Sequence, residues 1–174
     1  MDWSEKHCLQ DHFVYLAVSS GLKVGVTRSS QIPTRWIDQG AWRAIKLAKT
    51  PNRYIAGNIE VELKKHMQDK TNWRNMLTDK FDRDIDLIIT KDKTAGLMPP
   101  EMQDYITLDD EIYEFEYPVL YFPGKVNSIN LDKISRFSGK LIGIKGQYLI
   151  FEDGYVINIR KYGGYKLSLF VDQD

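Results

Sequence analysis

The chain has 174 residues, 43% of them hydrophobic, which is enough to close the core of one ordinary domain or two small ones. No apolar run approaches the roughly 20 residues that a membrane helix needs. The first ten residues are charged around a single tryptophan, so we expect no secretory signal. The single cysteine excludes an internal disulfide and a cysteine-rich zinc site built from this chain alone. We therefore expect a cytoplasmic protein with no membrane partner.

The overall balance of 24 basic and 24 acidic residues hides an uneven distribution along the chain. Residues 1–76 carry 12 Lys and Arg against 7 Asp and Glu, residues 79–116 carry 4 against 12, and residues 117–174 carry 8 against 5. Two basic blocks that flank an acidic one suit a protein whose ends face a polyanion. Charges scattered over a solvated surface explain these counts about equally well.

The first elements in chain order are a β-hairpin and a short helix. Residues 12–18 and 22–27 are rich in strand-forming residues, and Gly21 lies in the tight turn between them. Pro33 suits the first turn of a helix, and Gly40 helps to end that helix.

A third strand, over residues 44–49, leads into the best amphipathic helix of the chain. This helix is predicted to begin after Thr50-Pro51 and to run to about Met67. Its apolar stripe consists of Ile55, Ile59, Leu63 and Met67. A polar and aromatic corner at residues 71–74 then precedes a helical turn that runs through Leu77. The predicted order of this first domain, residues 1–78, is β-β-α-β-α.

Five features stand in a recognisable order within residues 12–76: a hairpin tyrosine, a Val-Gly pair, an arginine-bearing helix, a helical glutamate and a following asparagine. In this order they resemble the GIY-YIG nuclease superfamily. Nearly the whole chain is also similar to the uncharacterised bacterial family of domains of unknown function DUF2797. The segments that carry this similarity are VYLAVSSGLKVGVTR, QIPTRWIDQGA, TPNRYIAGNIEVELKKH, DKTNWRNML and GIKGQYLIFEDG. The cysteine-rich extension that members of this family carry does not precede these segments here.

The superfamily resemblance implies a role for each matching residue. Tyr15 corresponds to the first tyrosine, and Gly25 to the second glycine. Arg35 corresponds to the arginine, Glu60 to the metal ligand and Asn72 to the asparagine that closes the site. By this resemblance Glu60 would hold one hard cation, Mg²⁺ or Mn²⁺. Arg35 would fork onto phosphate oxygens, and Tyr15 would orient or deprotonate the attacking water.

Lys23 departs from this pattern, because the superfamily has its second tyrosine at that position, two residues before Gly25. A lysine of ordinary pKa is protonated at neutral pH and cannot be a base. Lys23 would be a base only if its surroundings depressed its pKa, and otherwise it clamps phosphate. Phe13 also replaces the leading glycine of the first motif. The sequence therefore supports binding of a nucleic-acid backbone better than its cleavage.

Beyond residue 78 the sequence predicts an acidic connector over residues 79–111 and a β-rich domain over residues 112–174. The connector is expected to hold short helices near residues 82–89 and 100–105. Strands are predicted at residues 112–120, 126–129, 140–145, 148–151, 155–160 and 165–171, with turns at Asp153-Gly154 and Gly163-Gly164. The fold class is therefore α+β, with a GIY-YIG-like domain and a small antiparallel β-barrel or curled sheet.

Two functions from different classes follow from these patterns. The first is a nucleic-acid-binding protein, for DNA or RNA, with a GIY-YIG-like site that is either a working metal-dependent endonuclease or a degenerate one. Its site residues would be Tyr15, Lys23, Arg35, Glu60 and Asn72. The alternative is a non-catalytic protein-interaction adaptor, which uses the same fold as a scaffold and contacts a protein partner through the β-rich domain. Taken singly, each site residue also suits an ordinary place in a core or on a surface.

Overall fold

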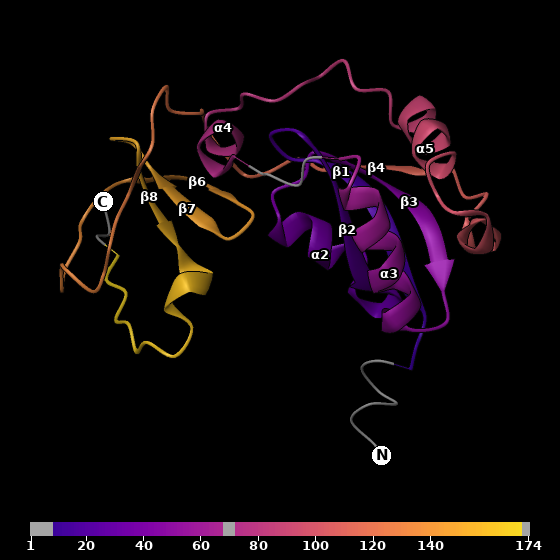
Figure 1. Ribbon diagram of the computed structural model, residues 1–174. Coiled ribbons are helices and arrows are strands. Elements are labelled where there is room, and N and C mark those ends of the chain that lie inside the picture. The colour runs from indigo at the N-terminus through magenta and orange to yellow at the C-terminus, as the bar shows by residue number, and fades with distance from the viewer. Residues whose placement is uncertain (1–8, 68–71, 172–174) are drawn as a thin grey trace.

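The computed structural model describes residues 9–67 and 72–171, which form a mixed α+β fold with two four-stranded sheets (Figure 1). The first elements are β1 (His12–Val18), β2 (Leu22–Arg28), the 3-10 turn η1 (Ser29–Gln31), α2 (Thr34–Asp38), β3 (Arg43–Thr50), α3 (Arg53–Lys64) and α4 (Trp73–Leu77). They are followed by α5 (Leu87–Ala95), η2 (Pro100–Tyr105), β4 (Ile112–Glu114), β5 (Asn127–Ser128), β6 (Leu141–Lys145), β7 (Tyr148–Phe151), β8 (Tyr155–Asn158) and η3 (Ile159–Tyr162). Within the two described ranges, every helix is too short or too polar to cross a membrane.

The first sheet has the strand order β2-β1-β3-β4, and each neighbouring pair is antiparallel. Its hairpin and its third strand confirm the strands predicted from the alternation of side chains. Helix α3 covers one face of this sheet (Figure 1). The alternate residues Val14, Leu16 and Val18 of β1 point to this face, where they are fully buried.

Helix α3 begins slightly later than Thr50-Pro51 predicts, because its N-cap is Asn52. The side chain of Asn52 accepts a hydrogen bond from the backbone N–H of Ile55 at 3.0 Å. The buried stripe is Ala56, Ile59 and Leu63, whereas the predicted Ile55 and Met67 only flank it. Residues spaced strictly four apart drift around a helix that has 3.6 residues per turn. Spacings of three and then four residues, as in Ala56, Ile59 and Leu63, keep the side chains on the face that packs against the sheet.

The opposite face of the sheet carries a smaller core around Trp36 of α2. Tyr15 and Ala17 of β1 and Ala44 of β3 lie buried there. The indole ring of Trp36 contacts Tyr15, with ring centroids 5.6 Å apart, and Tyr113 at 4.9 Å. Helices α2 and α3 therefore lie on opposite faces of the same hairpin.

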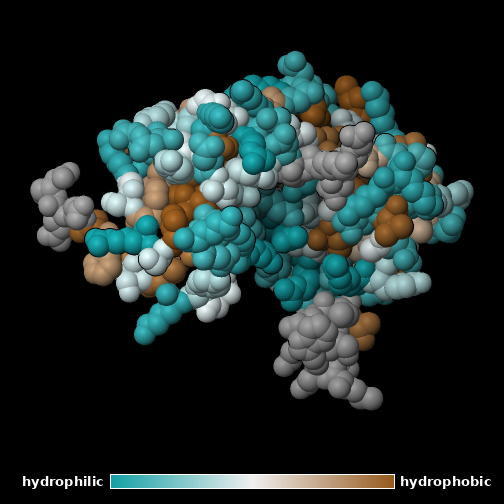
Figure 2. Space-filling view, turned by 60° about the vertical axis from the view of Figure 1, so that its left-hand side comes forward, coloured by the Kyte–Doolittle hydropathy of each residue, from teal (hydrophilic) through white to brown (hydrophobic). Residues whose placement is uncertain are grey.

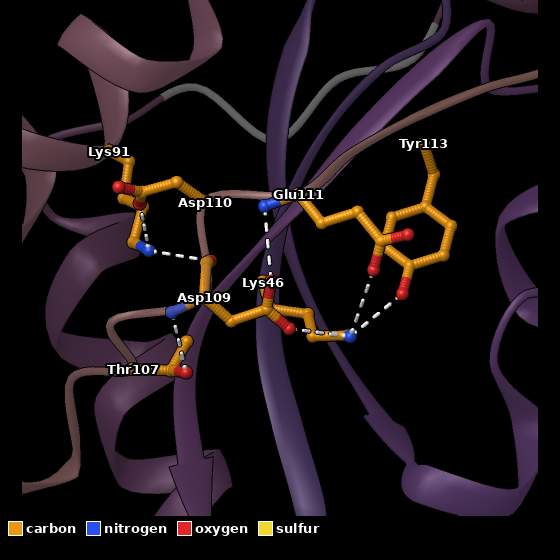
Figure 3. Close-up of polar contacts among 7 residues, drawn as sticks. All are labelled: Lys46, Lys91, Thr107, Asp109, Asp110, Glu111 and Tyr113. Carbon is orange, nitrogen blue, oxygen red and sulfur yellow. Dashed lines mark hydrogen bonds and ion pairs between the residues drawn. The ribbon is translucent and has the colours of Figure 1, made fainter.

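The acidic segment after residue 78 folds back against β3. Nζ of Lys46 donates hydrogen bonds to Asp109 and to Tyr113, each at 2.8 Å (Figure 3). Nζ of Lys91 donates to Asp110 at 2.7 Å. The predicted strand over residues 112–120 is short, since only β4 forms, and it pairs with β3 of the first sheet.

The helix expected at residues 82–89 starts later than predicted and becomes α5. Asp86 is its N-cap, and Oδ1 of Asp86 accepts hydrogen bonds from the backbone N–H groups of Ile88 and Ile89. The second expected helix is confirmed as η2.

The second sheet has the order β5-β8-β7-β6 and is open rather than closed into a barrel. Strand β5 pairs with β8 in parallel, so the sheet is mixed and not purely antiparallel as predicted. Closure would require β5 to pair with β6, and β5 is only two residues long. The turn at Asp153-Gly154 is confirmed, with Gly154 at φ +75°. Residues 165–171 alternate like a strand but pair with none of the described strands.

Helix α4 packs on this second sheet. Met76 and Leu77 share a buried cluster with Val126, and the ring of Trp73 stacks on Tyr148 with centroids 5.7 Å apart. We call α4 with the second sheet the β lobe, and the first sheet with α2, α3 and α5 the α/β lobe. Figure 2 shows a hollow between the two lobes with largely hydrophilic walls.

The lobes meet at the end of α2. Gly40, at φ +66°, leaves room for the side chain of Met76, because a Cβ there would lie 2.4 Å from its sulfur. Gly146, in the β6–β7 turn, lies so close to the backbone of Asp38 that a Cβ would come within 2.9 Å of its carbonyl oxygen. The hydroxyl of Tyr117 donates to the carbonyl of Ala41 at 2.7 Å. These contacts fix the position of α2.

The Lys46–Asp109 pair predicts a pH-dependent contribution to stability. Burial opposes the charge of Lys46, but the bonds to Asp109 and Tyr113 outweigh it and raise the pKa of Lys46. The hydrogen bond from Lys46 also lowers the pKa of Asp109 below its unfolded value of 3.8. The ion pair therefore stabilises the fold fully above pH 3.8, and this stabilisation is lost as the pH falls through the pKa that Asp109 has in the folded protein. We expect Asp109→Asn to lower the free energy of unfolding by about 0.5–1 kcal/mol at pH 7 and by less near pH 3.

Urea unfolding followed by circular dichroism measures both values. Glu101→Gln is the matched control, because Glu101 is exposed and forms no ion pair with the described residues. A loss for Asp109→Asn that is equal at both pH values would contradict the expected linkage.

Candidate functional site

Tyr15 lies at the centre of the candidate site. Its side chain is 1% exposed, and its hydroxyl donates a hydrogen bond to Oε1 of Gln39 at 2.9 Å. The ring crosses the outer strand β2 at Gly25, its partner in the ladder. A Cβ at Gly25 would lie 2.6 Å from both Cζ and the hydroxyl oxygen of Tyr15, so only glycine leaves room for the ring. The phenol therefore reaches the outer edge of the sheet.

Two charged side chains act on this phenol. Burial raises the pKa of Tyr15; the charge and hydrogen bonding of Arg35 lower it, and the carboxylate of Glu60 raises it. Arg35 comes from α2 and Glu60 from α3, which lie on opposite faces of the sheet. Since the net effect raises the pKa, the phenol is protonated at neutral pH and acts as a hydrogen-bond donor.

Glu60 is partly enclosed, with 22% of its side chain exposed. Its carboxylate lies 3.2 Å from Nζ of Lys64, one helical turn further along α3. This ion pair directs the carboxylate along α3 toward Lys64. The sequence-based expectation that Glu60 lies next to the apolar stripe agrees with the burial of its neighbour Ile59.

Lys23 lies on the same face of β2 as Gly25, two residues away, and is opposite Ala17 in the ladder. It is only 8% exposed, which is unusual for a lysine. Its side chain therefore lies on the Tyr15 face of the hairpin. Its role as a base or as a phosphate clamp stays a prediction.

Asn72 lies at the far end of the hairpin. Its backbone N–H donates to Oγ of Ser20 in the β1–β2 turn at 2.8 Å. Its side-chain oxygen caps α4 by accepting from the N–H groups of Arg74 and Asn75 at 3.1 and 3.3 Å. Asn72 thus serves as a helix cap beside the turn, whereas the charges of Arg35 and Glu60 both influence the pKa of Tyr15. The catalytic part of Asn72 also stays a prediction.

Gln39 is the residue that sequence reasoning missed. Its amide oxygen is the hydrogen-bond acceptor of Tyr15. In the sequence it is one polar residue at the end of a short helix, with no motif around it. Only the fold of α2 over the sheet brings it to the phenol.

The superfamily resemblance implies a metal ion at Glu60. Among residues 9–67 and 72–171, no group of three or more His, Cys, Asp or Glu side chains gathers as a metal site would require. Glu60 is a single hard carboxylate whose described partner is Lys64, so a Mg²⁺ site at this position stays a prediction.

A second buried cation, Lys145, has a structural explanation. It is 2% exposed, and its ammonium lies 4.9 Å from the ring centroid of Phe122 and 5.3 Å from that of Phe81. The carboxylate of Asp79 lies 3.9 Å away. Burial lowers the pKa of Lys145, while the rings and Asp79 compensate part of the lost hydration.

Gly25→Ala tests the packing that shapes the site. The added Cβ forces the buried ring of Tyr15 to move, so we expect the free energy of unfolding to fall by about 1–3 kcal/mol. Gly57→Ala is the matched control, because a Cβ at this position in α3 meets no atom within 4 Å. The control should gain up to about 1 kcal/mol from its better helix propensity. Urea unfolding of both variants measures the difference, and equal stabilities would contradict the close packing.

Comparison with known proteins gives one match. A family model described as "Protein of unknown function (DUF2797)" matches residues 1–167. No curated protein and no solved structure matches the chain.

Proposed function

The chain belongs to the DUF2797 family, and we propose that it binds nucleic acid through a GIY-YIG-like site at the outer edge of its first sheet. In this proposal a backbone phosphate lies beside Tyr15, between Arg35 of α2 and Glu60 of α3. The observation that carries the proposal is the packing of the buried Tyr15 ring against Gly25 of the outer strand, where its hydroxyl bonds to Gln39 of the α2 end and the charges of Arg35 and Glu60 influence its pKa. Arg35 belongs to α2 and Glu60 to α3, so each stands in a helix, as the superfamily resemblance implies.

Arg35 supplies the positive charge of the proposed site. A guanidinium binds two phosphate oxygens at once, which gives orientation as well as affinity. The protonated phenol of Tyr15 is a neutral donor that can turn from Gln39 to a phosphate oxygen. Lys23, on the same face, is the residue that the resemblance makes a phosphate clamp.

Glu60 would hold the divalent cation that the superfamily resemblance implies. Mg²⁺ bound there would supply positive charge to the scissile phosphate. Glu60 has first to leave Lys64, whose ammonium is 3.2 Å away. The high pKa of Tyr15 and the replacement of the second tyrosine by Lys23 both oppose the removal of a proton from water. The proposed site is accordingly built for binding, with weakened cleavage chemistry.

Fluorescence anisotropy tests the binding proposal with labelled single-stranded, double-stranded and branched DNA and RNA at about 50 and 200 mM salt. We expect affinity that falls steeply with salt, and a loss of tenfold or more on Arg35→Ala. Arg136→Ala is the matched control, since Arg136 is exposed and forms no ion pair with the described residues. This control should change the affinity less than twofold.

Two outcomes would contradict the proposal. The first is a protein that binds none of these nucleic acids with salt-dependent affinity, which would favour the adaptor function instead. The second is an equal effect of Arg35→Ala and Arg136→Ala. Incubation of the same substrates with Mg²⁺ or Mn²⁺ tests cleavage separately: product that forms with the wild type but not with Glu60→Ala would show that the site is an active nuclease.

A further inference from the structure

A pocket of about 480 Å³ opens between α4 and β5, in the β lobe. We call it the α4–β5 pocket. Three cations line it, together with hydroxyl and amide side chains. The residues that matter here are Arg74, Asn75, Thr78, Lys80, Lys125 and Ser128.

The pocket carries uncompensated positive charge. None of its described lining residues is acidic. Arg74, Lys80 and Lys125 form no ion pair within the described parts of the chain, although many other cations do, such as Lys46 and Lys91. The whole chain has a formal net charge of zero, so three cations together in one hollow are a local concentration of charge.

Asp79, the acidic residue nearest in sequence, is already engaged elsewhere. One of its oxygens lies 2.7 Å from the guanidinium of Arg83, and the other lies 3.9 Å from Nζ of Lys145. It stands between Thr78 and Lys80 but does not line the pocket. The chain therefore leaves the charge of this pocket for an external anion.

The walls of the pocket are held in place by packed side chains. Val126, from the β5 side, is 3% exposed and shares a buried cluster with Met76 and Leu77 of α4. The guanidinium of Arg74 lies over the ring of Trp73, 4.3 Å from its centroid. The backbone N–H of Lys80 donates to the carbonyl of Asn75 at 2.8 Å. The backbone that carries the cations of the pocket is therefore fixed before an anion binds.

We propose that the α4–β5 pocket binds a phosphate group. A guanidinium, two ammonium groups and the side-chain amide of Asn75 suit an anion with several oxygens and more than one negative charge, whereas the hydroxyls of Thr78 and Ser128 donate to backbone carbonyls. The phosphate can belong to a polynucleotide backbone or to a small phosphate compound, and the pocket chemistry is the same for both. This proposal does not depend on the Tyr15 site.

The double variant Lys80→Gln/Lys125→Gln tests the proposal in the full chain. Its matched control is Lys133→Gln/Lys166→Gln, which removes two exposed lysines of the same lobe that have no ion pair with described residues. Calorimetry measures the binding of inorganic pyrophosphate, and anisotropy measures that of a labelled 20-nucleotide oligo(dT). Circular dichroism verifies that both variants are folded.

We expect at least one probe to bind the Lys80/Lys125 variant tenfold or more weakly than the control variant. Weaker oligonucleotide binding would identify the ligand of the pocket as a backbone phosphate. In that case the slope of log affinity against log salt concentration should also be smaller by about 1.4. Weaker pyrophosphate binding with unchanged oligonucleotide binding would identify a small phosphate compound.

The proposal is overturned if neither probe distinguishes the two double variants, or if the wild type binds neither probe. One pattern would support the Tyr15 site and overturn the α4–β5 pocket. In this pattern Arg35→Ala weakens oligonucleotide binding, whereas the Lys80/Lys125 variant changes the affinity for neither the oligonucleotide nor pyrophosphate. The reverse pattern would remove the Tyr15 site and leave the pocket.

Discussion

The close approach of the Tyr15 ring to the backbone of Gly25 is the contact on which the candidate site depends. A strand side chain normally stands over its own sheet, but the missing side chain at Gly25 lets this ring extend across the outer strand. The hydroxyl thereby reaches the outer strand, where Gln39 at the end of α2 accepts its hydrogen bond.

The position of α2 is the second constraint, since this helix supplies both Arg35 and Gln39. It is only five residues long and would not be stable alone. Trp36 anchors it in the core between Tyr15 and Tyr113, and the β lobe presses on its end through the glycine contacts at Gly40 and Gly146. A change in how the lobes pack would therefore reach the Tyr15 site through α2. The β lobe supports the site in addition to carrying its own pocket.

Local sequence signals are sufficient for the elements that are stabilised locally. Alternation and Gly21 predict the β1–β2 hairpin, and the apolar spacing predicts α3. Distant partners determine the rest. The fold-back of the acidic segment depends on the pairing of Lys46 with Asp109, more than 60 positions away, which no local pattern shows. Residues 165–171 have the alternation of a strand, but a strand also needs a partner in the fold.

The candidate site shows the same division between local and distant information. The order of Tyr15, Gly25, Arg35 and Glu60 could be read through a family resemblance, whereas the contact of Tyr15 with Gln39 could not. Asn72 matched a motif, yet its side chain has a clear structural task as the cap of α4. A residue type at a suitable spacing is therefore compatible with several roles until its hydrogen bonds are known.

The most direct measurement is an NMR titration of the tyrosine ¹³Cζ signals, with Tyr15 assigned from the Tyr15→Phe spectrum. If Arg35 and Glu60 both act on the phenol, its pKa lies above 10 in the wild type, rises in Arg35→Ala and falls in Glu60→Gln. A Tyr15 pKa that is the same in all three proteins would show that the charges do not meet at the phenol. That result would contradict the site.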